Sequence, residues 1–82
     1  MNVSVEISLY PLADDFIPPI DAVIRRLNEN PDIEVVTNPM ATQLRGDYDD
    51  VMAVLQDAMR STFESLPHAV FAIKVLNNPI AD

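Results

Sequence analysis

The chain has 82 residues, of which 49% are hydrophobic and 22% are charged, a balance typical of one small folded domain. Thirteen acidic residues stand against five Lys and Arg residues, and the resulting net charge of −8 argues against a nucleic-acid partner because it would repel a phosphate backbone. The chain has no cysteine for disulfides or thiolate metal sites and no run of roughly 20 apolar residues, so we expect a cytoplasmic protein without a membrane segment.

The first half of the sequence predicts a strand followed by a helix. Residues 2–10 alternate between apolar and polar side chains, which is the period of a β-strand, and Pro11 is expected to end it. After Asp14 and Asp15, apolar residues recur at steps of three and four, which predicts a helix that stops before Pro31. The apolar stripe of this helix consists of Ile17, Ile20, Val23, Ile24 and Leu27.

The middle of the sequence predicts a hairpin and a second helix. Residues 33–38 and 40–45 are expected to form two short strands, separated by the break at Asn38-Pro39. Gly46, the single glycine, is expected where the chain turns sharply from strand to helix, with Asp47 as the N-cap. Apolar residues from Val51 to Leu66, Phe63 among them, are expected to form the buried face of this helix.

A final strand over residues 69–76 completes the order β-α-β-β-α-β, and residues 77–82 are expected to form a loose tail. Two right-handed βαβ halves of this kind predict an α+β, ferredoxin-like plait. Its sheet has four antiparallel strands and carries both helices on one face. We therefore expect residues 1–82 to be a single domain.

The sheet face without helices is expected to carry a mixture of polar and apolar side chains. The first strand contributes Ser4, Glu6, Ser8 and Tyr10 to it, and the last strand contributes Val70, Ala72, Lys74 and Leu76. A face of this composition is too apolar to remain in water, so a second copy of the chain is its expected cover, in a homodimer or homotetramer. Glu6 and Lys74 are expected to face each other, either as an ion pair at this interface or with Glu6 accepting hydrogen bonds from an amino-bearing ligand.

The sequence gives little support to catalysis. His68 is the only histidine, and no serine or aspartate in a suitable pattern supports it as a triad base. Asp47, Asp49 and Asp50 lack the length and the distal glutamate of a calcium loop, so helix capping explains them better. We therefore predict no catalytic residue and no metal site, and an enzyme is the least favoured class.

Two segments resemble the small thiamine-binding protein family, the YkoF-like superfamily. They read V-S-V-E-I-S-x-Y-P-L near the start and T-N-P-M-x-T-Q-x-x-G-D-Y-D-x-V-M in the middle. The resemblance implies subunits that pair their sheets into dimers and often tetramers. It also implies that thiamine or its hydroxymethylpyrimidine half binds between subunits. We expect no cofactor. The matching candidate ligand positions are Glu6, Ser8, Thr37, Asn38, Met40, Thr42 and Gln43.

Because neighbouring residues of a strand point to opposite faces, we expect only one of Thr37 and Asn38, and only one of Thr42 and Gln43, to face a pocket. The favoured hypothesis is a non-enzymatic protein that binds a small molecule at the subunit interfaces of a homo-oligomer. The alternative is a structural or interaction module whose open sheet face serves only assembly or partner docking.

Overall fold

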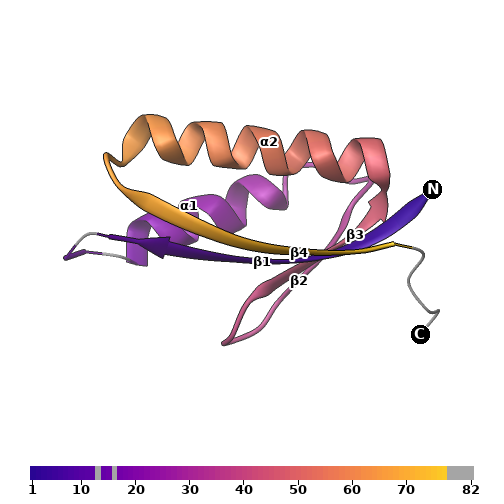
Figure 1. The fold of residues 1–82 in the computed structure, drawn as a ribbon, viewed down its shortest axis with the longest axis horizontal. Coiled ribbons are helices and arrows are strands. Elements are labelled where there is room, and N and C mark those ends of the chain that lie inside the picture. Colours follow the sequence, from indigo (N-terminus) through magenta and orange to yellow (C-terminus); the bar gives the residue numbers. More distant parts are fainter. Residues whose placement is uncertain (13, 16, 78–82) are drawn as a thin grey trace.

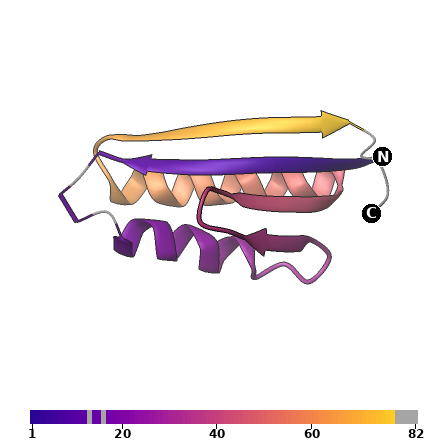
Figure 2. The same ribbon diagram turned by 90° about the horizontal axis from the view of Figure 1, so that it is seen from below.

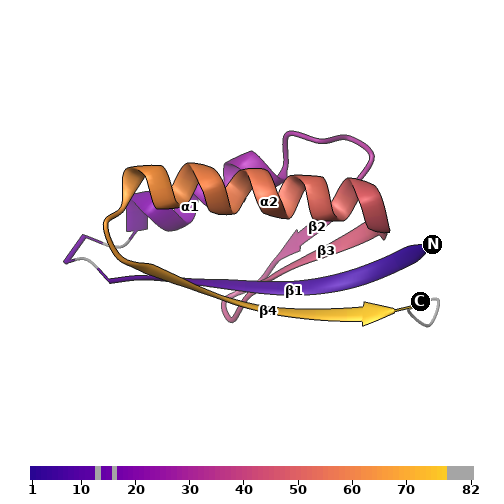
Figure 3. The same cartoon turned by 45° about the horizontal axis from the view of Figure 1, so that its top comes forward.

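The structure is a computed structural model that describes residues 1–12, 14–15 and 17–77. Its elements follow the predicted order and are β1 (Asn2–Pro11), α1 (Ile17–Leu27), β2 (Glu34–Thr37), β3 (Thr42–Asp47), α2 (Tyr48–Ser65) and β4 (Ala69–Asn77). The four strands form one antiparallel sheet in the order β2-β3-β1-β4. Both helices lie on one face of that sheet and leave the other face bare (Figures 1 and 3). The predicted ferredoxin-like α+β fold is confirmed.

The core lies between the helices and the inner face of the sheet. β1 is a central strand, and alternation along it places Val3, Val5 and Ile7 on this inner face, where all three are buried. Leu27 of α1 and Leu44 of β3 are fully enclosed against them. The remaining buried apolar side chains are Val23, Ile33, Val51, Leu55 and Ala58.

The hairpin is shorter than predicted because its turn takes up residues 38–41. The backbone N–H of Asn38 donates to the carbonyl of Ala41 at 3.0 Å. The side-chain oxygen of Asn38 accepts hydrogen bonds from the backbone N–H groups of Met40 at 2.8 Å and Ala41 at 2.9 Å. A side chain that satisfies the backbone in this way stabilises a turn in place of a ladder. β3 therefore begins at Thr42, two residues later than the sequence indicated.

The predicted turn at Gly46 is wrong, whereas the predicted cap at Asp47 is confirmed. Gly46 lies inside β3 and pairs with Val3. Asp47 has an extended backbone, and its side chain accepts a hydrogen bond from the N–H of Asp49 at 3.2 Å, as an N-cap residue does. The chain passes from β3 into α2 without the left-handed residue that a glycine would have supplied.

Two further predictions differ from the structure, one on α2 and one at the end of β4. Phe63 is half exposed instead of buried and meets Phe71 edge to face, with 5.6 Å between the ring centroids. Asn77 belongs to β4, so the predicted tail does not begin there, and residues 78–82 lie outside the described residues. Within the described ranges, none of the helices has the length and apolar character needed to cross a membrane.

Candidate functional site

A pocket forms where β1 outruns its neighbour β3. β1 pairs with β3 from Asn2 to Ile7, but the strand continues to Pro11. Figure 2 shows β1 passing the turn between β2 and β3, with α1 lying alongside. The pocket at this place has a volume of about 240 Å³. The pocket therefore results from the difference in length between β1 and β3.

The walls of this pocket, called here the hairpin pocket, are mainly apolar. One wall is the inner side of α1, which contributes Ile20, Val23, Ile24 and Leu27. The β1 side is formed by residues 7–10, and the hairpin side by residues 37–42. Ile20 and Ile24 belong to the apolar stripe that the sequence predicts for this helix. Both are only partly buried, so they can contact a ligand as well as the core.

The polar groups of the hairpin pocket are concentrated at Thr37 and Thr42. These residues oppose each other in the β2–β3 ladder, and their hydroxyl oxygens are 3.3 Å apart. Thr42 is only 6% exposed. When one hydroxyl donates to the other, the pair still offers one O–H donor and unused acceptor lone pairs. A ligand in the hairpin pocket would meet this pair as a single polar point in an apolar wall.

Asn38 and Met40 border the same pocket in different ways. The side-chain oxygen of Asn38 already accepts two backbone hydrogen bonds, so this residue fixes the turn and has only its NH₂ group to offer. Met40, at the tip, is 87% exposed. Its flexible thioether can reach over the rim and contact a ring.

The seven predicted residues do not form one site. Ser8, Thr37, Asn38, Met40 and Thr42 border the hairpin pocket. Glu6 and Gln43 oppose each other on the bare face of the sheet, where Gln43 borders a separate hollow of about 150 Å³. The Nζ atom of Lys74 is 3.8 Å from Oε1 of Glu6, in the predicted register, but in the single chain the side chain of Lys74 is 86% exposed and that of Glu6 is 44% exposed. Only an additional subunit on the bare face would bring Glu6 and Gln43 into a closed site.

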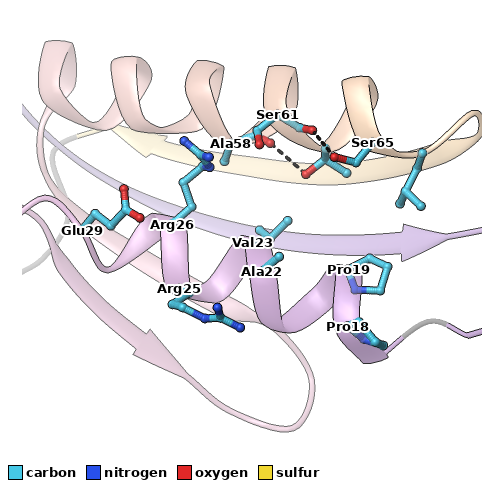
Figure 4. Close-up of a pocket in the computed structure, with 12 residues that line it drawn as sticks. Pro18, Pro19, Ala22, Val23, Arg25, Arg26, Glu29, Ala58, Ser61 and Ser65 are labelled. Carbon is cyan, nitrogen blue, oxygen red and sulfur yellow. Dashed lines mark hydrogen bonds between the residues drawn. The ribbon is translucent and has the colours of Figure 1, made fainter.

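A larger pocket of about 400 Å³ lies on the outside of the helical layer, between α1 and α2 (Figure 4). Two of its hydroxyl groups are occupied within α2, because Thr62 donates to the carbonyl of Ala58 at 2.8 Å and Ser65 donates to that of Ser61 at 3.1 Å. At one end Arg26 donates to Asp57 at 2.9 Å, a contact that raises the pKa of the guanidinium. This pocket contains none of the predicted residues, and its remaining polar groups include the charged side chains of Arg25 and Glu29, so the hairpin pocket is the better candidate for an uncharged ring.

In the described part of the chain, we find no grouping of side chains that is typical of a catalytic site or a metal site. His68 is exposed in the loop before β4, where its backbone carbonyl accepts a hydrogen bond from the N–H of Leu12 at 3.3 Å. Across residues 1–12, 14–15 and 17–77, no three His, Cys, Asp or Glu side chains gather as they would around a metal ion. The polar side chains that line the hairpin pocket carry hydroxyl and amide groups, which can donate hydrogen bonds to a ligand and accept them from it.

Comparison with known proteins gives one family and several closely similar folds. The model of the YkoF-related family matches residues 2–79. A Streptococcus pneumoniae protein of known structure is 26% identical, with a TM-score of 0.90, and the match covers 98% of this chain and 90% of that one. No curated protein sequence matches the chain.

Two further solved structures share the fold at lower identity. A Thermotoga maritima protein that is provisionally assigned to thiamine biosynthesis or salvage is 18% identical, with a TM-score of 0.85 over 95% of this chain and 85% of that one. A hypothetical protein from Methanocaldococcus jannascii is 23% identical, with a TM-score of 0.85 over 99% of this chain and 84% of that one. The fold of the chain is thus shared with bacterial and archaeal proteins of similar length.

Proposed function

The chain belongs to the YkoF-related family, and from this premise we propose that it is a non-enzymatic, homo-oligomeric protein that binds thiamine or its hydroxymethylpyrimidine half. The observation that carries the proposal is the hairpin pocket, with its apolar walls and its paired threonine hydroxyls. The provisional assignment of the Thermotoga maritima protein supports the choice of ligand.

The size and chemistry of the hairpin pocket favour a single ring. Its volume of about 240 Å³ lies below the roughly 300–1,000 Å³ of pockets that enclose drug-sized ligands. An aminopyrimidine has flat apolar faces for Ile24 and Met40, and its ring nitrogens and amino group can bond to Thr37 and Thr42. The thiazolium half of thiamine would then extend past the rim, where the net charge of −8 favours a cation.

The bare face of the sheet supports association with further copies. Tyr10, Val36, Val70 and Leu76 are large apolar residues on this face, and each is about half exposed. A surface of this kind commonly marks an interface, and closed homo-oligomers are the commonest soluble assemblies. Ser8 and Tyr10 border the hairpin pocket at the same time, so a subunit on the bare face would come close to the pocket mouth.

A thermal-shift experiment tests the proposed ligand. Thiamine or hydroxymethylpyrimidine at 100 times its Kd is expected to stabilise the protein by about 2.7 kcal/mol. Thr42→Val keeps the shape of the side chain but removes its hydroxyl, so most of the ligand-induced rise in Tm should be lost.

Thr62→Val is the matched control, because Thr62 is 7% exposed and Thr42 is 6% exposed, while Thr62 bonds to its own helix outside the hairpin pocket. This variant should keep the full ligand-induced shift. The proposal fails if neither compound raises the Tm of the unmodified chain, or if Thr42→Val responds as strongly as Thr62→Val.

A second candidate is an interaction module without a ligand, favoured by the extent of exposed apolar surface on the bare face. In that case the face would be filled by another subunit or a protein partner. The hairpin pocket would then have no occupant. Concentration-dependent association together with no ligand-induced shift would identify this function.

A further inference from the structure

The pocket of about 400 Å³ between α1 and α2, called here the helix pocket, has no role in the proposed function. Its volume lies within the roughly 300–1,000 Å³ that is usual for pockets that bind small organic ligands. α1 forms one wall and α2 forms the other, and the side chains of both helices point along it in Figure 4. The two ends of the helix pocket differ in chemistry, and this difference indicates what the pocket can bind.

One end of the helix pocket is apolar. α1 and α2 run in opposite directions, so the start of α1 meets the end of α2 there, and this end is lined by Pro18, Pro19 and Leu66. The adjoining part of the pocket is closed by Val23 and Ala58, which are 7% and 0% exposed. An apolar group of a ligand would be removed from water at this end.

The other end of the helix pocket carries charges of both signs. Figure 4 shows Arg26 and Glu29 together at this end, far from the two prolines. The guanidinium of Arg26 donates one hydrogen bond to Asp57 at 2.9 Å, which leaves its other N–H groups available. Asp57 and, after it, Glu29 raise the pKa of this guanidinium, so the carboxylate of Glu29 lies close to it. Among the described residues, the Glu29 carboxylate has no ion-pair partner of its own.

Ser61 adds a free hydroxyl group on the α2 side. The hydroxyls of Thr62 and Ser65 donate to carbonyls of their own helix. Within the described ranges, the hydroxyl of the partly buried Ser61 makes no such bond. It can therefore donate a hydrogen bond to a ligand in the helix pocket or accept one from it.

The charges at this end decide which class of ligand fits. A simple anion would be attracted by Arg26 but repelled by Glu29 and Asp57, and a simple cation would be attracted by the carboxylates but repelled by Arg26. A ligand with one charge of each sign on neighbouring atoms avoids both repulsions. An α-amino acid has this arrangement, and its side chain extends away from the two charged groups.

We propose that the helix pocket binds a free α-amino acid with a large apolar side chain. The carboxylate of the ligand accepts hydrogen bonds from Arg26, its ammonium group donates to Glu29, and its side chain lies at the apolar end. The inference goes beyond the proposed function, because it concerns a different pocket and a different class of ligand.

Titration calorimetry with L-phenylalanine, L-leucine and two derivatives tests the class of ligand. N-acetyl-L-phenylalanine lacks the ammonium group and L-phenylalaninamide lacks the carboxylate, while both keep the ring. Each derivative should bind at least about tenfold more weakly than L-phenylalanine, because it leaves one charged residue of the pocket without a partner. Equal binding of the amide would indicate a site for amines, and equal binding of the acetylated compound a site for anions. Either result would overturn the inference.

Filling the helix pocket tests the position of the site. Ala22→Leu adds bulk from an exposed residue of α1 that lines the helix pocket but not the hairpin pocket, so it should abolish binding of L-phenylalanine. Ala53→Leu makes the same change on the exposed side of α2, away from both pockets, and should leave the Kd unchanged.

Removing one charge tests the role of Glu29. Glu29→Gln should weaken binding of L-phenylalanine about tenfold, because a charge-assisted hydrogen bond to the ammonium group is lost. Glu64→Gln removes the same charge from an exposed position of α2 that does not line the pocket, and should change the Kd by less than about twofold.

The inference is wrong if neither L-phenylalanine nor L-leucine binds, or if Ala22→Leu binds L-phenylalanine as tightly as Ala53→Leu does. These titrations are carried out without thiamine or hydroxymethylpyrimidine. Ala22→Leu should also keep the full rise in Tm with thiamine, so the amino-acid site and the hairpin pocket are tested separately.

Discussion

The two faces of the sheet are built from the same strands but have different physical roles. On the inner face, Val3, Val5 and Ile7 of β1 are almost completely buried beneath the helices. On the bare face, Ser4, Glu6, Ser8 and Tyr10 alternate with them and remain accessible. Every second residue of one strand thus contributes to stability, while the residues between them are available for association. In a small domain, the two-residue period of a strand is therefore enough to separate these roles.

The largest expected difference between the faces concerns two leucines. Leu44 is 0% exposed on the inner face, whereas Leu76 is 57% exposed on the bare face. Leu44→Ala should lower the free energy of unfolding by about 2–5 kcal/mol, because a cavity remains in the core. Leu76→Ala should change it by less than about 0.5 kcal/mol in dilute protein. Urea unfolding measures both values.

An equal loss of unfolding free energy in Leu44→Ala and Leu76→Ala would contradict this difference between the two faces. It would mean that the bare face is buried as deeply as the core even when the protein is dilute. In that case the assembly, and not the single chain, would be the unit that unfolds.

A smaller effect is expected at Gly46, which lies on the inner face. A Cβ atom at this position would meet the backbone oxygen of Asp32 at 3.4 Å, Cγ2 of Val51 at 3.5 Å and Cγ1 of Ile33 at 3.6 Å, all ordinary contact distances. Gly46→Ala should therefore stabilise the chain by about 0.4–1 kcal/mol, through a lower entropy of the unfolded state. Thermal unfolding that shows a loss of stability would instead support the sharp turn that the sequence indicated.

The smallest effect on stability is expected for Glu6→Ala on the bare face. The pair with Lys74 spans 3.8 Å, and its side chains are 44% and 86% exposed, so its loss should cost less than about 0.5 kcal/mol in the single chain. A double-mutant cycle with Lys74→Ala measures the coupling. A coupling that grows with protein concentration would show that a second subunit covers the pair, and weaker assembly of Glu6→Ala with an unchanged ligand response would favour the interaction module.

Sequence patterns predicted the fold well because alternation and helical periodicity involve many residues at once. The two-residue period of β1 was enough to separate its inner from its outer residues, and Asp47 identified the start of α2. The errors lie where a single side chain decides the structure. Asn38 closes the turn with its own oxygen, so that β2 ends at Thr37 and β3 starts only at Thr42, and Gly46 has the residue type of a turn but the conformation of a strand.

The candidate site was harder to predict because it depends on relative lengths and faces. The hairpin pocket exists because β1 continues beyond Ile7 while β3 starts at Thr42, and no local motif records that mismatch. The resemblance identified Thr37 and Thr42 as candidates, and the register brings them together. Glu6 and Gln43 occur in the same motifs, but alternation places them on the other side of the sheet.

The central position of β1 also affects how the chain reaches its native state. β1, at residues 2–11, is paired on one side by β4, at residues 69–77, so this ladder closes a loop that includes most of the molecule. Ladders between distant segments slow folding, because the entropy of loop closure is lost before the contacts form. During synthesis, the β1–β4 ladder can form only after β4 has left the ribosome. We therefore expect the hairpin and α2 to form early and the β1–β4 ladder to form in the rate-limiting step.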